Sequence, residues 1–389
     1  MNKYLNEYAE FIKQFNTVGT NVLFYKNDGY IETVSTGYAF LESKIPSHKE
    51  SIYRIASISK VIVAIGLLKL HEEGKVDLDE DISKYLGFLV RNPKFPEIKI
   101  TLRMVLTQTS SIIDDGNFEN GIYKGYDGAN STDDFIPLKE LLTPGSIHYF
   151  KGYSDHKPGS EFIYSNLGCG ILACVCEKIT GEYFPEYIKK ELLHPLGIYS
   201  GFRLEDLKYP ENLVGHYYYI DGKFKLNRDY DSFKRVQCLK YPLGDNFRGV
   251  AGGLYISAYD LSKIMSMLMN KGHYNNIRIL KESIESLDKS VFKKFRGLPK
   301  DSRYIKSEDI LYEIKKILYE AGDFSCTANK KLPRHGCRRL HCYENSDAES
   351  GNYIFGDGKE SGFGLYFTVK QQGIAIGFPA QIVRYTPNL

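Results

Sequence analysis

The sequence predicts an α+β fold, an α/β sandwich in which strands from both chain ends form one antiparallel sheet. Two patterns carry this prediction. Near the N-terminus, residues 21–40 alternate apolar and polar side chains around Asn27-Asp28-Gly29, as in a β-hairpin. Near the C-terminus, residues 363–369 and 374–378 have the pattern of two more strands. Helix-rich sequence lies between, so we expect the chain ends to pair beside a helical region.

The helical region is expected to begin with a buried helix. Residues 61–70 are apolar on nearly all faces, which indicates a helix inside a large domain. Gly74 follows Glu72 and Glu73, and a glycine at this point is expected to end the helix.

Residues 112–159 have a different composition, rich in Gly, Asp, Ser and Tyr, with little helical period before Leu138. Such a long insert predicts either a surface loop or a lid over a site. Its acidic residues admit metal or acid–base chemistry, although acidic residues in such segments more often cap helices and turns. These residues are Asp114, Asp115, Asp133 and Asp134.

Two later segments complete the organisation. Residues 216–224 predict a small hairpin that turns at Asp221-Gly222. Residues 289–348 carry charge runs that we expect to form a solvated face. We therefore expect a single domain over residues 1–389, with a sheet subregion (1–50 and 350–389), a helical subregion (about 55–270) and this insert (about 289–348).

The charge and hydropathy of the sequence argue against some classes of function. The net charge is +3 and no long basic run occurs, which argues against nucleic acid as a partner. The most apolar run, residues 61–70, is too short for a transmembrane helix and carries Lys69. The first fifteen residues lack the apolar core of a secretion signal, so the expected location is cytoplasmic. The oligomeric state stays open.

The most informative motif is Ser57-Ile58-Ser59-Lys60, just before the buried helix. A serine three residues before a lysine at a helix start places both side chains on one face. A lysine amine in an apolar setting can take the proton of a serine hydroxyl, because desolvation lowers its pKa. An isolated match of this spacing is more often an N-cap serine with an exposed lysine. The buried helix that follows favours a nucleophile, Ser57, activated by Lys60.

Several further segments, taken in order, resemble one family, the serine β-lactamases and penicillin-binding-protein-like hydrolases, closest to the class C branch. They are residues 53–60, 67–85, 100–112, 157–172, 192–198, 249–265 and 361–369. The resemblance implies the β-lactamase/transpeptidase-like fold, with an antiparallel sheet from both chain ends. In residues 106–112, "LTQTSSI", Gln108 and Ser111 replace the His and Gly that the family usually has.

Tyr164-Ser165-Asn166 matches the family's second motif, Tyr-x-Asn. The resemblance implies that Tyr164 is a general base and that Asn166 positions lysine and substrate amide. The alternative is a turn after Pro158-Gly159 with a tyrosine in the core.

The third motif departs from the family. A Lys-Thr-Gly or His-x-Gly is usual there, whereas this chain has Gly356-Asp357-Gly358. The missing cation weakens the case for β-lactam recognition. Lys359 could replace it if the strand register shifts, and His335 is a poorer candidate. Gly358 and the backbone N–H of Lys359 are still expected to supply half of an oxyanion hole, with the Ser57 N–H as the other half.

Metal binding is not expected. The thiols of the "CGILACVC" segment (residues 169–176) are expected to be free and buried. A second group has thiolates and imidazoles near one another but no C-x-x-C pair, and arginines crowd it. Its members are Cys326, His335, Cys337, His341 and Cys342.

The sequence therefore predicts a serine hydrolase that acts through an acyl-enzyme on a small ester, amide or D-amino-acid peptide, possibly also a β-lactam, without a cofactor. The alternative is a catalytically silent protein of the same fold that binds a cell-wall fragment or a protein partner. The degenerate third motif favours this alternative.

Overall fold

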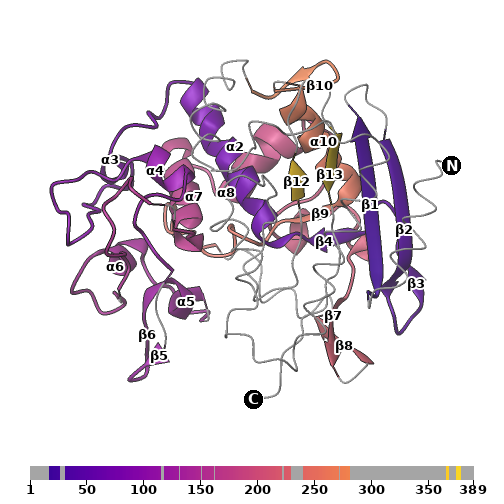
Figure 1. The fold of residues 1–389 in the computed structure, drawn as a ribbon, viewed down its shortest axis with the longest axis horizontal. Helices are drawn as coiled ribbons and strands as arrows, with labels where there is room; N and C mark the ends of the chain where they lie inside the picture. Colours follow the sequence, from indigo (N-terminus) through magenta and orange to yellow (C-terminus); the bar gives the residue numbers. More distant parts are fainter. Residues whose placement is uncertain are drawn as a thin grey trace.

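In the computed structural model, strands from both ends of the chain meet in one antiparallel sheet (Figure 1). The structure describes residues 17–26, 31–114, 118–130, 132–149, 151–161, 163–220, 223–228, 240–270, 272–280, 365–367 and 374–377. The strand order is β12–β13–β1–β2–β3. The bounds are β1 Gly19–Lys26, β2 Ile31–Phe40, β3 Ile45–Pro46, β12 Leu365–Phe367 and β13 Ile374–Gly377.

Strand β1 joins the two chain ends. It pairs with β2 from Gly19 opposite Gly37 to Tyr25 opposite Ile31. On its other side it pairs with β13, where Leu23 faces Gly377. The predicted α+β fold and the predicted N-terminal hairpin are therefore confirmed, while the turn of that hairpin, residues 27–30, lies outside the described residues.

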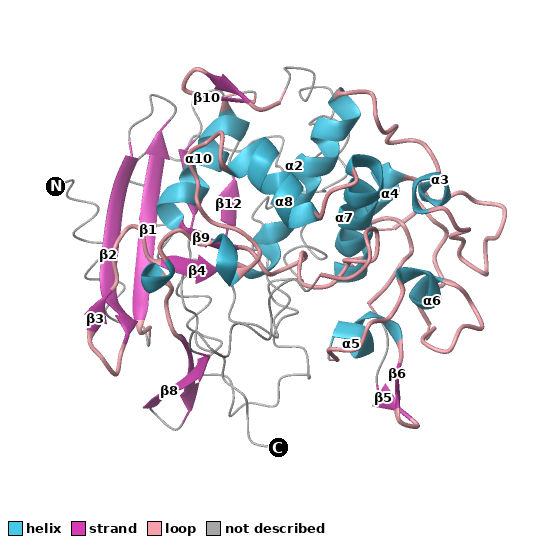
Figure 2. Cartoon of the chain, turned by 180° about the vertical axis from the view of Figure 1, so that it is seen from behind, coloured by secondary structure: helices cyan, strands magenta, loops and turns pink. Residues whose placement is uncertain are grey.

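Helices cover the sheet and form the rest of the core (Figures 1 and 2). Helix α10 (Ala258–Met269) packs against β1 and β13. Beyond it, α2 (Ser59–Glu72) and α7 (Asn166–Thr180) pack together in the helical region, with α8 (Phe184–Ile188) beside them. This arrangement places the start of α2 near the centre of the molecule.

The remaining elements are short. The strands are β4 Ile52–Arg54, β5 Phe118–Glu119, β6 Ile122–Tyr123, β7 His216–Ile220, β8 Lys223–Arg228, β9 Tyr255–Ser257, β10 His273–Tyr274 and β11 Ile277–Arg278. The helices are α3 Ile82–Leu86, α4 Leu102–Leu106, α5 Gly125–Asn130 and α6 Leu138–Leu142, with 3-10 turns η1 Ala56–Ile58, η3 Leu204–Asp206 and η4 Pro210–Asn212 and the π-helical turn η2 Lys189–Leu193. Strands β7 and β8 confirm the predicted hairpin of residues 216–224, while its predicted turn, Asp221-Gly222, lies outside the described residues.

Helix α2 has the predicted buried character. Its residues Ile62, Val63, Leu67 and Leu70 are fully buried in the main hydrophobic core. The helix ends at Glu72, and Gly74 follows in the left-handed conformation that ends many helices, as predicted.

Helix α7 is fixed at its start and along its side. The Ser165 Oγ accepts a hydrogen bond from the Gly168 N–H at 2.9 Å, which caps the first turn. A Cβ at Gly170 would lie 2.4 Å from the Phe247 carbonyl oxygen, so a glycine is needed where the helix touches this loop. The described cysteines, all in α7, are free and buried as predicted: Cys169, Cys174 and Cys176.

The insert of residues 112–159 is more regular than the sequence suggests. It contains the small hairpin β5–β6 and helix α5, whose sequence GYDGAN has no apolar period. Tertiary contacts stabilise α5, because the Arg248 Nη1 donates to the Ala129 carbonyl at 2.6 Å and Tyr126 is buried. This short helix forms without a helical period in its sequence, since such contacts outweigh local propensity. The surface loop or lid expected for the insert stays a prediction.

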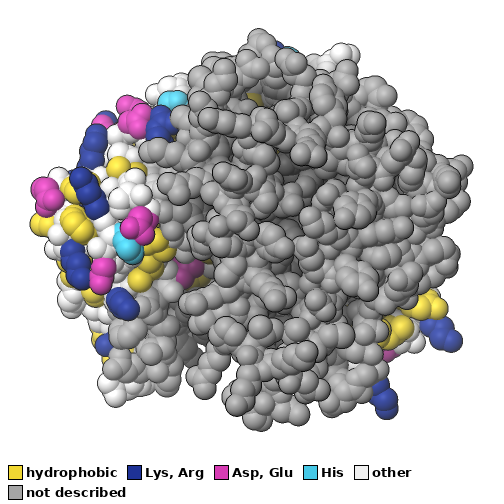
Figure 3. Space-filling view, viewed as in Figure 1, with side chains coloured by type: hydrophobic (Ala, Val, Ile, Leu, Met, Phe, Trp, Pro, Cys, Tyr) yellow, Lys and Arg dark blue, Asp and Glu magenta, His cyan; other side chains and the backbone are white. Residues whose placement is uncertain are grey.

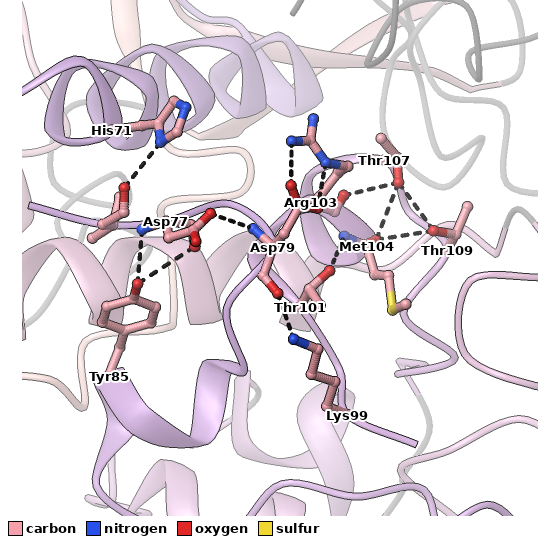
Figure 4. Close-up of polar contacts among 11 residues, drawn as sticks. His71, Asp77, Asp79, Tyr85, Lys99, Thr101, Arg103, Met104, Thr107 and Thr109 are labelled. Carbon is pink, nitrogen blue, oxygen red and sulfur yellow. Dashed lines mark hydrogen bonds and ion pairs between the residues drawn. The ribbon is translucent and has the colours of Figure 1, made fainter. Parts of the chain in front are cut away.

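A hydrogen-bonded unit connects the segment after α2 to α4 (Figure 4). Asp79 accepts from Arg103 through both carboxylate oxygens, at 2.7 and 2.8 Å. Thr101 caps α4 by accepting from the Met104 N–H at 3.2 Å. Thr107 closes the helix by donating to the Arg103 carbonyl at 2.9 Å. This unit fixes the chain just before Gln108.

Acidic and basic side chains are interspersed over the described part of one face, on the side of α3, α4 and α6 (Figure 3). This pattern agrees with the small net charge of the sequence. The insert of residues 289–348 and the Cys326, Cys337 and Cys342 group lie outside the described residues. The extent of the single domain stays a prediction.

Candidate active site

Ser57 lies in the 3-10 turn η1, directly before α2, and is buried. The preceding residue, Ala56, has a φ of +45°, a strained conformation for a side chain with a Cβ. Ser59 supports this turn, because its Oγ donates to the Ala56 carbonyl at 2.6 Å and accepts from the Leu254 N–H at 3.1 Å. The backbone around Ser57 is therefore held from two sides.

Lys60 follows one turn later and points at Ser57. Its Nζ lies 2.9 Å from the Ser57 Oγ, 2.7 Å from the Asn166 Oδ1 and 2.9 Å from the Ala251 carbonyl oxygen. These three neighbours come from the turn η1, the start of α7 and the loop before β9. The predicted pairing of Ser57 with Lys60 is present in the geometry.

Tyr164 approaches Ser57 from the segment before α7. Its hydroxyl lies 2.7 Å from the Ser57 Oγ, a hydrogen-bond distance. The Lys60 Nζ lies 4.7 Å from the centre of the Tyr164 ring, within range of a cation–π interaction. The serine oxygen is therefore within hydrogen-bond distance of both an amine and a phenol, and either group can exchange a proton with it.

Asn166 is the first residue of α7, and both the oxygen and the nitrogen of its side-chain amide are hydrogen-bonded. Its Oδ1 accepts from Lys60, and its Nδ2 donates to the Asp114 Oδ2 at 2.8 Å. Asp114 also accepts from backbone N–H groups at the start of the helix, so it acts there as a capping carboxylate. For Asp114, this contact confirms the expectation that acidic residues of the insert cap helices.

Gln108 and Ser111, the two departures from the family pattern, both have left-handed backbone conformations, with φ of +56° and +67°. The Gln108 Oε1 accepts from the Ser165 N–H at 2.6 Å, which ties the end of α4 to the Tyr164 segment. The Ser111 Oγ accepts from the Asn92 Nδ2 at 3.0 Å. A glycine would adopt the backbone conformation of residue 111 without strain, whereas a serine is strained there. The hydrogen bond from Asn92 offsets part of this strain energy.

The structure brings together Ser57, Lys60, Tyr164 and Asn166. Gly358 and Lys359, the predicted oxyanion residues, lie outside the described residues. Sequence reasoning missed the Ala251 carbonyl, since every residue has such a group and none is distinctive. The sequence signal for this carbonyl was that Ala251 lies in residues 249–265, one of the segments that resemble the family.

Within the described ranges, no group of three or more His, Cys, Asp or Glu side chains has an arrangement that could hold a metal ion. In the same part of the chain, no helix has the length and apolar character that crossing a membrane requires.

Comparison with known proteins gives a consistent family. A family model described as Beta-lactamase matches residues 8–295. Protein flp of Staphylococcus aureus (strain MRSA252) is 27% identical over 199 residues, which are 51% of this chain and 37% of that protein. The chain therefore matches well under half of the length of this relative.

Two solved structures share the fold. One is the octameric penicillin-binding protein homologue from Pyrococcus abyssi, with a TM-score of 0.55 and 27% identity, covering 76% of this chain and 59% of that one. The other is the D-amino acid amidase from Ochrobactrum anthropi SV3, with a TM-score of 0.53 and 20% identity, covering 72% of this chain and 71% of that one. At this low identity, the likeness to the amidase shows that the fold is shared and nothing about activity.

Proposed function

The chain belongs to the beta-lactamase family, whose model covers residues 8–295, and we propose that it is a serine hydrolase with Ser57 as its nucleophile. One observation carries the proposal. The Ser57 Oγ lies 2.9 Å from the Lys60 Nζ and 2.7 Å from the Tyr164 hydroxyl. A serine oxygen between two proton-exchanging groups has what acyl transfer needs, a base to remove its proton and an acid to protonate the leaving group.

The proposed reaction has two stages. The Ser57 oxygen forms a bond to the carbonyl carbon of an ester or amide, while its proton passes to Lys60 or Tyr164. The bond to the leaving group then breaks, and the leaving alcohol or amine takes that proton. Water attacks the resulting acyl-enzyme with the same two groups as proton carriers, which frees the acid and restores the serine. No cofactor takes part.

The negative charge on the carbonyl oxygen needs hydrogen-bond donors in the tetrahedral intermediate. We propose the backbone N–H of Ser57 as one donor. The second donor is proposed from the sequence, at Gly358 and Lys359, and Asn166 is proposed to position the substrate amide.

A neutral small ester, or a D-amino acid amide or short peptide, is the substrate class that we propose. The sequence at Gly356-Asp357-Gly358 supplies no cation for a substrate carboxylate, and a carboxylate at Asp357 would repel one. An amide substrate agrees with the name of the D-amino acid amidase that shares this fold.

Intact-mass measurement after exposure to a fluorophosphonate, a nitrophenyl ester and a penicillin tests the nucleophile. The wild type is expected to gain one fluorophosphonate adduct, and Ser57→Ala to gain none. Ser160→Ala is the matched control, because Ser160 is an exposed serine that should not affect labelling. A folded wild type without an adduct would favour the silent binding protein instead. Equal labelling of Ser57→Ala would mean that another residue reacts and that Ser57 is not the nucleophile.

A rate comparison tests the substrate class. The kcat/KM for a nitrophenyl ester is expected to exceed that for nitrocefin, which carries a carboxylate. Efficient nitrocefin hydrolysis would show that a cation for the carboxylate comes from elsewhere in the chain.

A further inference from the structure

Asp114 makes more hydrogen bonds than a helix cap requires. Its Oδ1 accepts from the Ser165 Oγ at 2.9 Å and from the Leu167 N–H at 2.8 Å. Its Oδ2 accepts from the Asn166 N–H at 2.6 Å and from the Asn166 Nδ2 at 2.8 Å. Helix α7 already has an N-cap, the Ser165 hydroxyl. The contact of Asp114 with the Asn166 side chain therefore calls for another explanation.

The Asp114 carboxylate determines which way the amide of Asn166 faces. An ionised carboxylate can only accept hydrogen bonds, so the NH₂ group of Asn166 must face it. The carbonyl end of the same amide then faces Lys60, where the Nζ to Oδ1 distance is 2.7 Å. A reversed amide would place two acceptors together at Asp114 and lose both hydrogen bonds.

The direction of this amide decides where the lone pair of Lys60 points. A neutral lysine amine has two N–H bonds and one lone pair. The Asn166 Oδ1 and the Ala251 carbonyl can only accept, so they take both N–H bonds. The remaining neighbour among the three is the Ser57 Oγ at 2.9 Å, so the lone pair faces the serine proton. A reversed Asn166 would instead offer an N–H to Lys60 and compete for that lone pair.

We propose that Asp114 is a positioning residue for acyl transfer, which acts through the side-chain amide of Asn166 to aim the lone pair of Lys60 at Ser57. The inference rests on the proposed function, because it assumes that Lys60 takes the proton of Ser57. It gives residue 114, in the insert, a role in the proton transfer at a site that it does not touch.

A double-mutant cycle with Asp114→Ala and Asn166→Ala tests this role. The readout is the rate of phosphonylation by a fluorophosphonate, measured by intact mass, with the melting temperature recorded for each variant. Asp114→Ala is expected to slow phosphonylation about 10²-fold, the scale of a misplaced catalytic group. In the Asn166→Ala background, Asp114→Ala is expected to change the rate by no more than about threefold, because the group through which it acts is gone.

A purely structural role predicts a different result. If Asp114 acted only by stabilising the start of α7, its removal would slow both backgrounds by the same factor, and this additivity would overturn the proposal. If Asp114→Ala does not fold, Asp114→Leu, which keeps a similar shape but has no acceptor for the Asn166 Nδ2, takes its place in the same cycle and is interpreted the same way.

Two controls complete the design. Ser165→Ala removes the N-cap hydroxyl of the same helix but leaves the Asn166 amide in contact with Asp114. It is expected to lower the melting temperature while phosphonylation stays within about threefold of the wild type. Asp133→Ala removes an exposed carboxylate of the insert and should change neither measurement. A loss of labelling with Ser165→Ala equal to that with Asp114→Ala would also overturn the proposal.

The two proposals can fail separately. An unlabelled wild type overturns both of them. A labelled wild type with an additive cycle overturns the role of Asp114 alone.

Discussion

Replacement of Lys60 by methionine is expected to remove most of the reactivity of Ser57. Methionine keeps the unbranched apolar stem but has no amine, so the contacts at 2.9, 2.7 and 2.9 Å to Ser57, Asn166 and Ala251 are all lost. A lost general base typically costs about 10²- to 10⁴-fold in rate. This loss corresponds to about 2.7 to 5.4 kcal/mol of activation free energy, at about 1.36 kcal/mol for each factor of ten.

The effect on folding should be smaller than the effect on rate. Two carbonyl oxygens lose a hydrogen-bond donor, and an unsatisfied buried acceptor costs about 1–3 kcal/mol. Only Ala251 is buried, whereas Asn166 is partly exposed, so water can replace the donor there. Folding of the wild type moves the Lys60 amine out of water, which costs free energy. The methionine variant does not have this cost, and this offsets part of the loss. We therefore expect Lys60→Met to fold and to show a modest change in melting temperature.

The assay is the rate of phosphonylation of Ser57, followed by intact mass, with circular dichroism to confirm folding. Lys69→Met is the matched control on the same helix, because Lys69 pairs with Glu191 at 3.2 Å instead of facing Ser57. The control is expected to react within about threefold of the wild type, since such partly exposed ion pairs contribute little. A folded Lys60→Met variant that reacts as fast as this control would refute the reasoning.

Three further predictions follow from described contacts. Tyr164→Phe removes only the hydroxyl 2.7 Å from the nucleophile, so phosphonylation should slow by about 10²-fold or more at an unchanged melting temperature. Burial raises the pKa of the Cys169 thiol to about 12, so iodoacetamide should modify it only after denaturation. The hydrogen bonds from Arg103 lower the pKa of Asp79, so this pair stabilises the fold above the unfolded pKa of about 3.9 and stops doing so as the pH falls through the lower folded pKa. Asp79→Asn should therefore lower the melting temperature slightly at neutral pH and not at pH values below both pKa values.

Each of these predictions has a contrary outcome. Unchanged labelling of Tyr164→Phe would leave Lys60 as the sole proton carrier. Rapid alkylation of Cys169 in the native protein would mean that α7 opens to solvent. A stability difference between Asp79→Asn and the wild type that persists at the lowest pH would show that the effect is not electrostatic. Because Asp79 is largely exposed, its contribution should stay below about 1 kcal/mol.

The parts of the site that depend on local spacing could be predicted from the sequence. Ser57 and Lys60 are three residues apart at the start of a helix, so one element positions both of them. The paired strands at the two ends of the chain were also predictable, because alternation of apolar residues is a local signal. Tyr164 and Asn166 needed the resemblance to a family, since their sequence distance from Ser57 says nothing about their place in space.

The parts that depend on tertiary contacts could not be predicted. The Ala251 carbonyl has no side-chain signature, although it accepts one of the hydrogen bonds of Lys60. Asp114 was one acidic residue among several in the insert, and its proposed role rests on its four hydrogen bonds. Helix α5 lacks an apolar period, and a contact from the distant Arg248 stabilises it.

The hydrogen bonds around Ser57 join segments that are far apart along the chain. Lys60 and Asn166 are 106 residues apart, Tyr164 and Ser57 are 107 apart, and Lys60 and Ala251 are 191 apart. During synthesis, helix α2 emerges from the ribosome long before the loop that contains Ala251, so the early chain carries a serine without its complete set of partners. We expect the hydroxyl to become reactive only when the late segment has docked, which spares unfinished chains from unwanted acylation. On gradual heating, phosphonylation should accordingly disappear at or below the temperature at which helicity is lost, whereas labelling that outlasts the helical signal would contradict this expectation.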